Sequence, residues 1–510
     1  MTHPGNFPAV LRLGIALLAA AAVAGAARGD DLIVTTANDV VNGDVSSPAA
    51  LGAAPGPDGI SLREALTAAD GAAGPTAITI DPSLSGRTIA LTSDLPPVTR
   101  EGISILGPID ASGRALVTVS GSPISVFASH FRAAGLRLIG SRGAVFYVFA
   151  GRPDAPGSAT VSDVRIEDDV FEGGGAVDVG HAVSIGTAEE SSGARVEGVT
   201  IARNSFLDFG GDVAAVLCEA GGTAGAVGEV AVDGNTFRGN AIGVRIGVEG
   251  GGNRVSGVAV TGNDFFDNGI AVAAISGARL DRPPSTDGVV EGILLARNRI
   301  RGGDAAAIYF LAGGSGATGL VVRDVDVVDD VVWGERGFAV GGEAGSGTGS
   351  TGNRIENVRI VNDTMASGAG RSGVAFYADS YGAGGNSVSG IEIANTIFAG
   401  DGAAFAGDAV PSLVTHSILR DPRFVGRDGN FSGDPAFIDP ARGDFHLRAG
   451  SGAIGRGLAS AAPCVDADGR ARRADGSVDV GAYEFEAPLR ARPCPISAAI
   501  PAVPARGASR

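Results

Sequence analysis

The sequence predicts an all-β fold: a right-handed parallel β-helix, or solenoid, with a short N-terminal capping helix and a C-terminal cap module. Three observations predict this fold. A strand-like motif recurs about every 32 residues through the middle of the chain, the apolar residues are mostly small or β-branched, and both ends depart from the repeat. A solenoid exposes its core and strand edges at each end, so such departures are expected of caps.

The composition of the 510-residue chain favours thin stacked layers over one large globule. Glycine contributes 82 residues and aromatic residues only 5%, yet hydrophobic residues reach 44%, mainly through Ala, Val, Ile and Leu. A core of small side chains suits a repeat protein in which each layer contacts only its neighbours.

Residues 1–29 have the pattern of a secretory signal: a polar start, an apolar run and small residues at the end. Cleavage after Ala26 or after Gly29 fits the pattern, and we favour Gly29 because a strand-like segment starts at Leu32. An uncleaved membrane anchor is the alternative. No other stretch has the length and apolarity of a membrane span, so we expect a secreted or cell-surface protein whose mature chain does not cross the membrane.

Residues 30–125 are predicted to form the N-terminal cap and the first coils. Ser61 and Glu64 have the spacing of a capping box. In this motif the side chain of each residue accepts a hydrogen bond from the backbone N–H of the other. The helix that follows has an apolar face, made by Leu62, Ala65, Leu66 and Ala69. Such a helix is suited to closing the first coil of a solenoid.

Residues 126–415 contain the repeats. Each has an alternating apolar pair, then Asn or Asp in most copies, and then a large apolar residue. The polar position falls at Asp169, Asn204, Asn235, Asn263, Asn298, Asp330, Asp363 and Thr396. A second alternating run and a variable loop complete each unit, so we expect two or three short strands per repeat. Stacked units would place the alternating Val, Ile and Phe residues in continuous inner ladders.

The polar position is interpreted as a corner between strands. Asn and Asp tolerate left-handed backbone geometry and bond neighbouring backbone groups, so stacked corners should form an Asn/Asp ladder. A β-propeller is the second possibility for the fold, but its blades need about 40–50 residues. The observed spacing is shorter.

The N-terminal region resembles the CSLREA domain of bacterial surface β-helix proteins. The resemblance rests on the segments 32–36, 60–66 and 94–99. The cysteine that names the family is Ile60 here, and the mature N-terminal segment has no upstream cysteine. The resemblance therefore implies a surface β-helix whose cap is held by packing without a disulfide.

Residues 416–486 resemble the choice-of-anchor Q module, whose members carry varied C-terminal surface anchors. The matching segments follow in order at 434–440, 443–447, 451–457, 466–469 and 478–484. Residues 487–510 form a Pro/Ala/Arg-rich tail with neither an apolar span nor a sorting motif. We therefore expect release or non-covalent retention at the surface.

Charge and residue content exclude some functions. Removing residues 1–29 takes away two Arg and no acid, which leaves 37 Arg against 56 Asp plus Glu and a net charge of −19. This charge repels nucleic acid and anionic lipid. The chain has no lysine, which excludes Schiff-base chemistry. Cys464 and Cys494 could pair in an oxidising compartment, leaving Cys218 as a small core residue.

Two acidic pairs have the residue type that glycosidases use as acid and base, Asp168–Asp169 and Asp329–Asp330. Neighbouring strand residues face opposite sides, and Asp169 and Asp330 occupy corner positions, so we interpret both pairs as structural. The Gly-His-Ala sequence at His181 only approximates the Gly-His-Gly turn of β-helix hydrolases.

A lyase requires carboxylates that hold Ca²⁺ and an Arg positioned as base. The chain offers these residue types in two places: Asp208 and Asp212 near Arg203, and Asp264 and Asp267 near Arg297. We take Asp208, Asp212 and Arg245 as candidate catalytic residues, on the condition that they converge in a cleft.

Asp466 and Asp468, in the sequence Asp-x-Asp-Gly, are the candidate metal ligands. They resemble part of a calcium loop but lack the third Asp and the final Glu. Weak Ca²⁺ binding is the most that they imply, and no other cofactor is expected. His130, His181, His416 and His446 lack the spacing of metal ligands.

Two functions are consistent with the sequence. The favoured one is an extracellular structural or interaction scaffold that binds a cell-surface glycan or another protein. The alternative is a polysaccharide lyase or glycoside hydrolase of the pectin-degrading β-helix type. The low aromatic content, with Trp333 the single tryptophan, weakens both carbohydrate hypotheses. An enzyme should gather carboxylates and an Arg or His in one groove, whereas a scaffold should scatter them.

Overall fold

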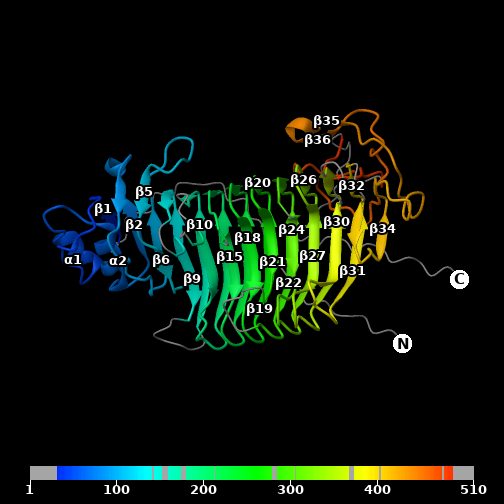
Figure 1. Cartoon of the computed structure of the whole chain (residues 1–510). Helices are drawn as coiled ribbons and strands as arrows, with labels where there is room; N and C mark the ends of the chain where they lie inside the picture. The colour runs from blue at the N-terminus through cyan, green and yellow to red at the C-terminus, as the bar shows by residue number, and fades with distance from the viewer. Residues whose placement is uncertain are drawn as a thin grey trace.

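The chain winds into a right-handed parallel β-helix, which confirms the predicted fold (Figure 1). The computed structural model describes residues 31–485 except 141–142, 152–158, 174–179, 212, 278–283, 305, 367–372, 401–403 and 474–475. The predicted signal sequence and the tail after residue 485 lie outside the described residues. None of the helices in the described part of the chain has the length and apolarity needed to cross a bilayer.

Each repeat contributes one strand to each of three parallel sheets, here called A, B and C. The described strands of sheet A are β1 (Leu32–Val34), β2 (Thr76–Ile80), β4 (Ile103–Leu106), β7 (Arg132–Ala134), β10 (Thr160–Glu167), β13 (Arg195–Ala202), β16 (Ala226–Asp233), β19 (Arg254–Thr261), β22 (Val289–Ala296), β25 (Val321–Val328), β28 (Arg354–Val361), β31 (Ser387–Ala394) and β34 (Leu413–Thr415). Those of sheet B are β3 (Thr88–Ala90), β5 (Val117–Ser120), β8 (Leu136–Ile139), β11 (Val170–Glu172), β14 (Ser205–Leu207), β17 (Thr236–Arg238), β20 (Asp264–Phe266), β23 (Arg299–Arg301), β26 (Val331–Trp333), β29 (Thr364–Ala366) and β32 (Ile397–Phe398). Those of sheet C are β6 (Ile124–Val126), β9 (Phe146–Ala150), β12 (Val183–Thr187), β15 (Ala214–Ala220), β18 (Ile242–Val248), β21 (Ile270–Ile275), β24 (Ala306–Leu311), β27 (Phe338–Ser346), β30 (Val374–Ser380) and β33 (Phe405–Gly407).

The core is a set of side-chain ladders inside the coil, as the alternating pattern predicts. Phe171, Phe206, Phe237 and Phe265 point inward from neighbouring strands of sheet B and are fully buried. Their rings stack at centroid distances of 4.9, 4.7 and 4.7 Å. The spacing follows from the distance between hydrogen-bonded strands, so in-register Phe residues stack without further adjustment.

The predicted Asn/Asp ladder is confirmed at the corner between sheets A and B. Asn235 Oδ1 accepts from the backbone N–H and the Nδ2 of Asn204 at 2.8 and 3.1 Å, and Asn235 Nδ2 donates to the carbonyl of Ile201 at 2.9 Å. The left-handed backbone lies elsewhere than predicted. The residue before each ladder position adopts it, as at Arg203 (φ 56°) and Gly234 (φ 63°). The ladder residue is the second of a tight turn and contributes its side chain to the neighbouring coil.

Three ladder positions carry Asp: Asp169, Asp330 and Asp363. Each Oδ1 accepts from a backbone N–H, of Leu136, Asn298 and Asp330 respectively, at 2.6–2.7 Å. The Oδ2 atoms, which correspond to the Nδ2 of an asparagine, have no hydrogen-bond partner among the described residues. Burial raises the pKa of all three carboxyls, that of Asp330 to about 8. Burial therefore favours the neutral, protonated carboxyl over the carboxylate at these positions.

The N-terminal end is closed by a helix, as predicted. Helix α2 (Leu62–Asp70) begins at the capping box of Ser61 and Glu64, and its apolar face is buried. Glu64 also accepts from the backbone N–H groups of Asn42 and Gly43 at 2.7 and 2.8 Å. A second helix, α1 (Pro48–Ala53), was not predicted, since six residues are too few to show a helical period.

The C-terminal region does more than close the end of the coil. After β34, residues 416–431 cover the last coil, with Leu419 buried in the main core. Residues 433–485, here called the C-terminal segment, then turn back and lie over sheet B (Figure 1). The segment includes 3-10 helix η2 (Pro440–Arg442) and the hairpin of β35 (Phe437–Asp439) and β36 (Asp444–Leu447); another 3-10 helix, η1 (Pro82–Leu84), lies in the N-terminal coils.

Two of the three cysteines, Cys218 and Cys464, lie in the described part of the chain, and both agree with the prediction. Cys218 is buried in β15, and burial raises the pKa of its thiol to about 12. Cys464 is disulfide-bonded. Cys494, its predicted partner, lies outside the described residues.

Candidate functional site

The predicted catalytic residues are not brought together. Asp208 lies at the corner that follows β14 of sheet B, whereas Arg245 lies in the middle of β18 in sheet C. Arg245 Nη2 is 3.6 Å from Glu219 Oε2, a carboxylate that the sequence did not single out. Arg203, expected beside Asp208, pairs with two acidic residues of the preceding coil. Asp212 lies outside the described residues.

The second predicted acidic group has different partners from those expected. Asp267 forms a bidentate contact with Nη2 of Arg301 at 2.7 and 2.8 Å, and Asp264 lies 3.8 Å from Arg299. Arg297, the expected partner, is instead a left-handed corner residue with φ 56°. Both observed pairs lie on the outer surface of sheet B.

The predicted metal ligands accept hydrogen bonds from protein groups. Asp466 Oδ1 accepts from the backbone N–H groups of Asp468 and Arg470 at 3.0 and 2.7 Å, and its Oδ2 accepts from that of Glu484 at 3.0 Å. Asp468 lies 2.9 Å from Nε2 of His446. In the part of the chain that the structure describes, no group of three or more His, Cys, Asp or Glu is placed to hold a metal ion. Asp466 therefore shapes a turn of the C-terminal segment.

A buried arginine joins the C-terminal segment to the solenoid. Arg472 is fully buried and contacts Asp329 at 2.6 Å and Glu484 at 3.1 Å. Burial raises the pKa of Asp329 to about 7, with Arg472 opposing the shift. The corresponding left-handed residues of the next two corners, Asn362 and Asn395, also bind backbone groups of the segment. Three successive corners therefore hold the segment in place.

The C-terminal segment covers the last three strands of sheet B. Val331, Thr364 and Ile397 point outward from β26, β29 and β32, yet each is at most 1% exposed. Val331 packs with Phe445 and Tyr483, both from the C-terminal segment. These outward residues are apolar or small because they face protein in place of solvent.

The preceding strands of sheet B are left open and carry a different set of outward residues. We call this the open face; it comprises Leu207, Arg238, Asp264, Phe266, Arg299 and Arg301, on strands β14 to β23. The guanidinium of Arg301 lies 5.9 Å from the ring centroid of Phe266, and that of Arg299 lies 5.9 Å from the ring of Trp333. Burial raises the pKa of Asp264, with Arg299 opposing the shift. The face thus combines aromatic rings with planar donors and acceptors.

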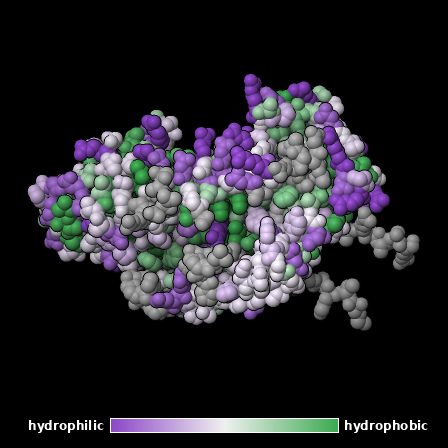
Figure 2. All heavy atoms as spheres, in the orientation of Figure 1, coloured by the Kyte–Doolittle hydropathy of each residue, from purple (hydrophilic) through white to green (hydrophobic). Residues whose placement is uncertain are grey.

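Raised segments stand on both sides of the open face along sheet B, with β8 and β11 between the first of them and β14. At the N-terminal end the loop between β4 and β5 stands up, closed by a bridge between Ile109 and Ala115. At the other end stands the C-terminal segment (Figure 1). In Figure 2 the upper outline of the molecule is lower between these two segments, and hydrophilic residues gather there. The open face is therefore the floor of a broad trough.

The end of the trough at β26 is a wall of polar and aromatic side chains. We define the wall as Asp444, Phe445, His446, Asp468 and Tyr483. His446 lies between Asp444 at 2.6 Å and Asp468 at 2.9 Å, and its ring stacks on Tyr483 at 4.0 Å. Burial opposes protonation, but hydrogen bonds to the two carboxylates raise the pKa of His446 overall. Trp333, at the foot of the wall, packs on Phe445 at 5.6 Å.

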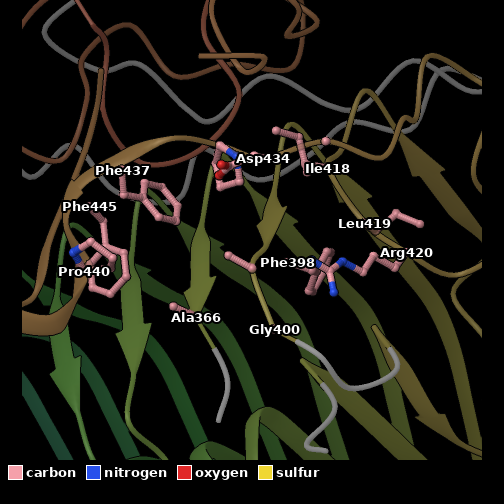
Figure 3. A pocket seen from close by; sticks show the side chains of 13 residues that line it. Ala366, Phe398, Gly400, Ile418, Leu419, Arg420, Asp434, Phe437, Pro440 and Phe445 are labelled. Carbon is pink, nitrogen blue, oxygen red and sulfur yellow. The ribbon is translucent and has the colours of Figure 1, made fainter. Parts of the chain in front are cut away.

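A pocket of about 470 Å³ lies further along the solenoid, between the end of sheet B and the C-terminal segment (Figure 3). The rings of Phe437 and Phe445 lie together on one side and Arg420 on the other. Most of the residues that line it are apolar, and the charged ones are Arg420 and Asp434. The open face carries more of the polar groups that an extended ligand requires.

The residues of the open face and wall were missed because the repeat motif left their positions unspecified. The outward residues of sheet B flank the large apolar residue of each motif, as Arg299 and Arg301 flank Ile300. The flanking pairs of the three motifs before Val331 each include a charged residue, Arg238, Asp264 or Arg299, whereas the pairs from Val331 to Ala399 include none. That change was the available signal that part of the sheet is covered.

Comparisons with known proteins identify no function for this chain. No protein-family model matches the sequence, and no curated protein matches it. Among solved structures, the chain is similar to a mannuronic acid specific polysaccharide family 6 lyase from human gut microbiota, with 12% identity over 71% of this chain and 86% of the lyase and a TM-score of 0.36. It is similar to PfbA, a surface adhesin of Streptococcus pneumoniae, with 10% identity over 66% and 85% of the two chains and a TM-score of 0.35. For pectate lyase Pel9A the identity is 13% over 89% and 96%, with a TM-score of 0.35. At these identities and TM-scores, none of the three similarities supports a statement about the activity of this chain.

Proposed function

We propose that the protein is an exported scaffold that binds a glycan along the open face of sheet B. The observation that carries the proposal is the composition of that face. Phe266 and the half-buried Trp333 lie beside the ion-paired Arg301 and Arg299. Sugars bind to proteins through aromatic faces and through planar side chains that bond their hydroxyl groups. Solenoids offer extended surfaces for such ligands.

Export is part of the proposal and is supported by sequence patterns. Residues 1–29 have the pattern of a secretory signal. The resemblance of the two ends to the CSLREA and choice-of-anchor Q domains favours a bacterial surface protein. We therefore place the open face outside the cell, where surface glycans are accessible.

The test is binding of the purified mature chain to an array of neutral and acidic polysaccharides. We expect binding to at least one class, and roughly two- to tenfold weaker binding for Trp333→Ala or Phe266→Ala, since an aromatic contact contributes roughly 0.5–1.5 kcal/mol. Tyr381→Ala is the matched control, because Tyr381 is an aromatic residue that is 83% exposed beyond β30 of sheet C. Equal binding by all variants would contradict the proposal.

A parallel assay separates binding from catalysis. The same polysaccharides are incubated with the protein, with and without Ca²⁺, and unsaturated products and reducing ends are followed. A binding scaffold leaves them intact. Turnover would favour the alternative of a polysaccharide lyase or glycoside hydrolase, with Glu219 and Arg245 as the first residues to substitute.

A further inference from the structure

The wall limits how a ligand can lie on the open face. One outward residue of each of β26, β29 and β32, namely Val331, Thr364 and Ile397, is buried beneath the C-terminal segment. The second outward residues of β26 and β29, Trp333 and Ala366, pack against the cluster that contains Phe445 of the segment. A chain that runs along the solenoid axis over β14 to β23 therefore meets the wall at Trp333. It cannot continue over the next coils.

The dimensions of the face favour that direction. Each strand of the open face has three residues, such as Asp264–Phe266, so the face is roughly 10 Å wide at about 3.3 Å per residue. The distance from β14 to β26 covers four strand spacings, roughly 19 Å at about 4.8 Å each. An extended ligand makes most contacts when it lies along the longer axis.

The wall offers groups suited to the end of a sugar chain. The side chains of Asp444 and Asp468 are 40% and 32% exposed, and each carboxylate has more acceptor sites than its contact with His446 uses. The side chain of Arg299, on the adjoining strand, is 46% exposed and supplies donors. A terminal sugar has one more free hydroxyl group than an internal sugar, so it gains an additional hydrogen bond at such a wall.

The charges of the site favour a neutral ligand. Arg299 and Arg301 are balanced by Asp264 and Asp267, and the two wall carboxylates are balanced by His446 and by Arg470, which lies 3.0 Å from Asp468. The chain as a whole carries a net charge of −17. A polyanion finds no net positive charge at this site, whereas the hydroxyl groups of a neutral sugar use donors and acceptors together.

From this geometry we propose that the open face and the wall together bind the end of a neutral glycan chain, with its terminal sugar at Trp333, Asp444 and Asp468. This inference rests on the proposed function, and it adds the ligand class and the mode of binding. It also gives the C-terminal segment a role in the site, since the solenoid alone lacks the wall.

The experiment compares chain lengths at constant linkage. Short oligosaccharides and long polymers of β-1,4-glucan, β-1,4-mannan and α-1,4-glucan are titrated into the full mature protein. If the protein binds chain ends, the association constant per mole of chains is the same at every length. The association constant per gram of glycan is then inversely proportional to chain length. Equal affinity per gram at all lengths would show binding to internal sugars and overturn the inference while leaving glycan binding intact. Binding of acidic glycans alone would overturn the neutral ligand class, and binding of no glycan would overturn the proposed function as well.

Variants of the wall provide a second test. Asp468→Asn should weaken binding of the short oligosaccharides about tenfold. Asp304→Asn, at a carboxylate that is 72% exposed and follows β23 outside the wall, should leave it unchanged. Thermal unfolding and far-UV circular dichroism establish that both variants are folded. If folded Asp468→Asn binds the oligosaccharides as the unchanged protein does, the wall has no part in recognition.

Discussion

The open and covered parts of sheet B share one interior and differ in their exteriors. Phe237 and Phe265 under the open part, and Val332 and Met365 under the covered part, occupy equivalent inward positions. Outward, the open part carries charged residues, whereas Val331 and Ile397 of the covered part are buried under the C-terminal segment. The interior pattern therefore defines the coil, and the exterior residues decide which coils bind protein and which face a ligand.

The corners differ between the same two parts. In the open part the ladder is made of asparagines, and the left-handed residue before each is Gly or Arg, as at Gly262 and Arg297. In the covered part the ladder continues as Asp330 and Asp363, and the left-handed Asp329 bonds Arg472 of the segment. Docking of the C-terminal segment thus depends on substitutions within a repeat that is otherwise unchanged.

The largest effect is expected when the ion pairs that dock the C-terminal segment on the covered part are broken. Arg472→Met leaves Asp329 and Glu484 buried without their partner, and breaking a buried ion pair in this way costs about 4 kcal/mol. Denaturant unfolding followed by the emission of Trp333, which packs on Phe445 of the segment, should show an earlier transition. The control Arg470→Met alters an arginine that is 53% exposed, and an equal loss there would contradict a specific role for Arg472.

The next largest effect on stability is expected from the two aspartates of the ladder in the covered part. The double substitution Asp330→Asn and Asp363→Asn replaces each unpaired Oδ2 by an amide Nδ2, which can donate a hydrogen bond. The pKa values in the folded state, about 8 for Asp330, lie above the unfolded value of about 3.9, so the native state holds protons that the unfolded state releases. The stability contributed by these groups is complete below about pH 4 and falls as the pH rises towards 8. We expect the doubly substituted protein to be more stable than the unchanged protein at pH 8, and the difference to become small at pH 4.

Urea unfolding at pH 4, 6 and 8 measures this gain. Asp324→Asn, at a carboxylate that is 53% exposed, serves as the control and should change little. A gain of equal size at every pH would show that these carboxyls are not protonated in the native state.

The asparagine part of the ladder should respond less strongly. Asn263→Ala removes the acceptor of the backbone N–H and Nδ2 of Asn235 and the donor to the carbonyl of Val232. Leaving buried groups unsatisfied costs about 2 kcal/mol. Urea unfolding against the control Ser256→Ala, on an outward position of β19, measures it. A loss no greater than the control's would mean that water replaces the missing amide.

The smallest effect on stability is expected on the open face. Arg301→Ala removes a pair with Asp267 in which both side chains are about half exposed, and such pairs contribute about 0–1 kcal/mol. Glycan binding should nevertheless fall severalfold, because the guanidinium faces the trough. A large loss of stability without a loss of binding would assign Arg301 to the fold and not to the ligand.

The sequence predicted the repeat, the corner ladder and the helical cap because each depends on local periodicity or on spacing within one turn. Asn235 and Asn263 are apparent from their place in the motif, and Ser61 and Glu64 from their separation. The docking of Arg472 on Asp329 could not be predicted in this way, because 143 residues separate them and one partner lies outside the repeat. The candidate site depends on the same long-range contact.

The most direct test of the account uses the single tryptophan of the chain, Trp333, at the foot of the wall. A neutral oligosaccharide that binds on the array is titrated into the mature protein while the emission of Trp333 is recorded. Binding at the open face predicts a saturable change in emission with the same midpoint as binding measured by calorimetry. Binding by calorimetry with no change in emission would place the ligand elsewhere on the molecule and contradict the assignment of the open face.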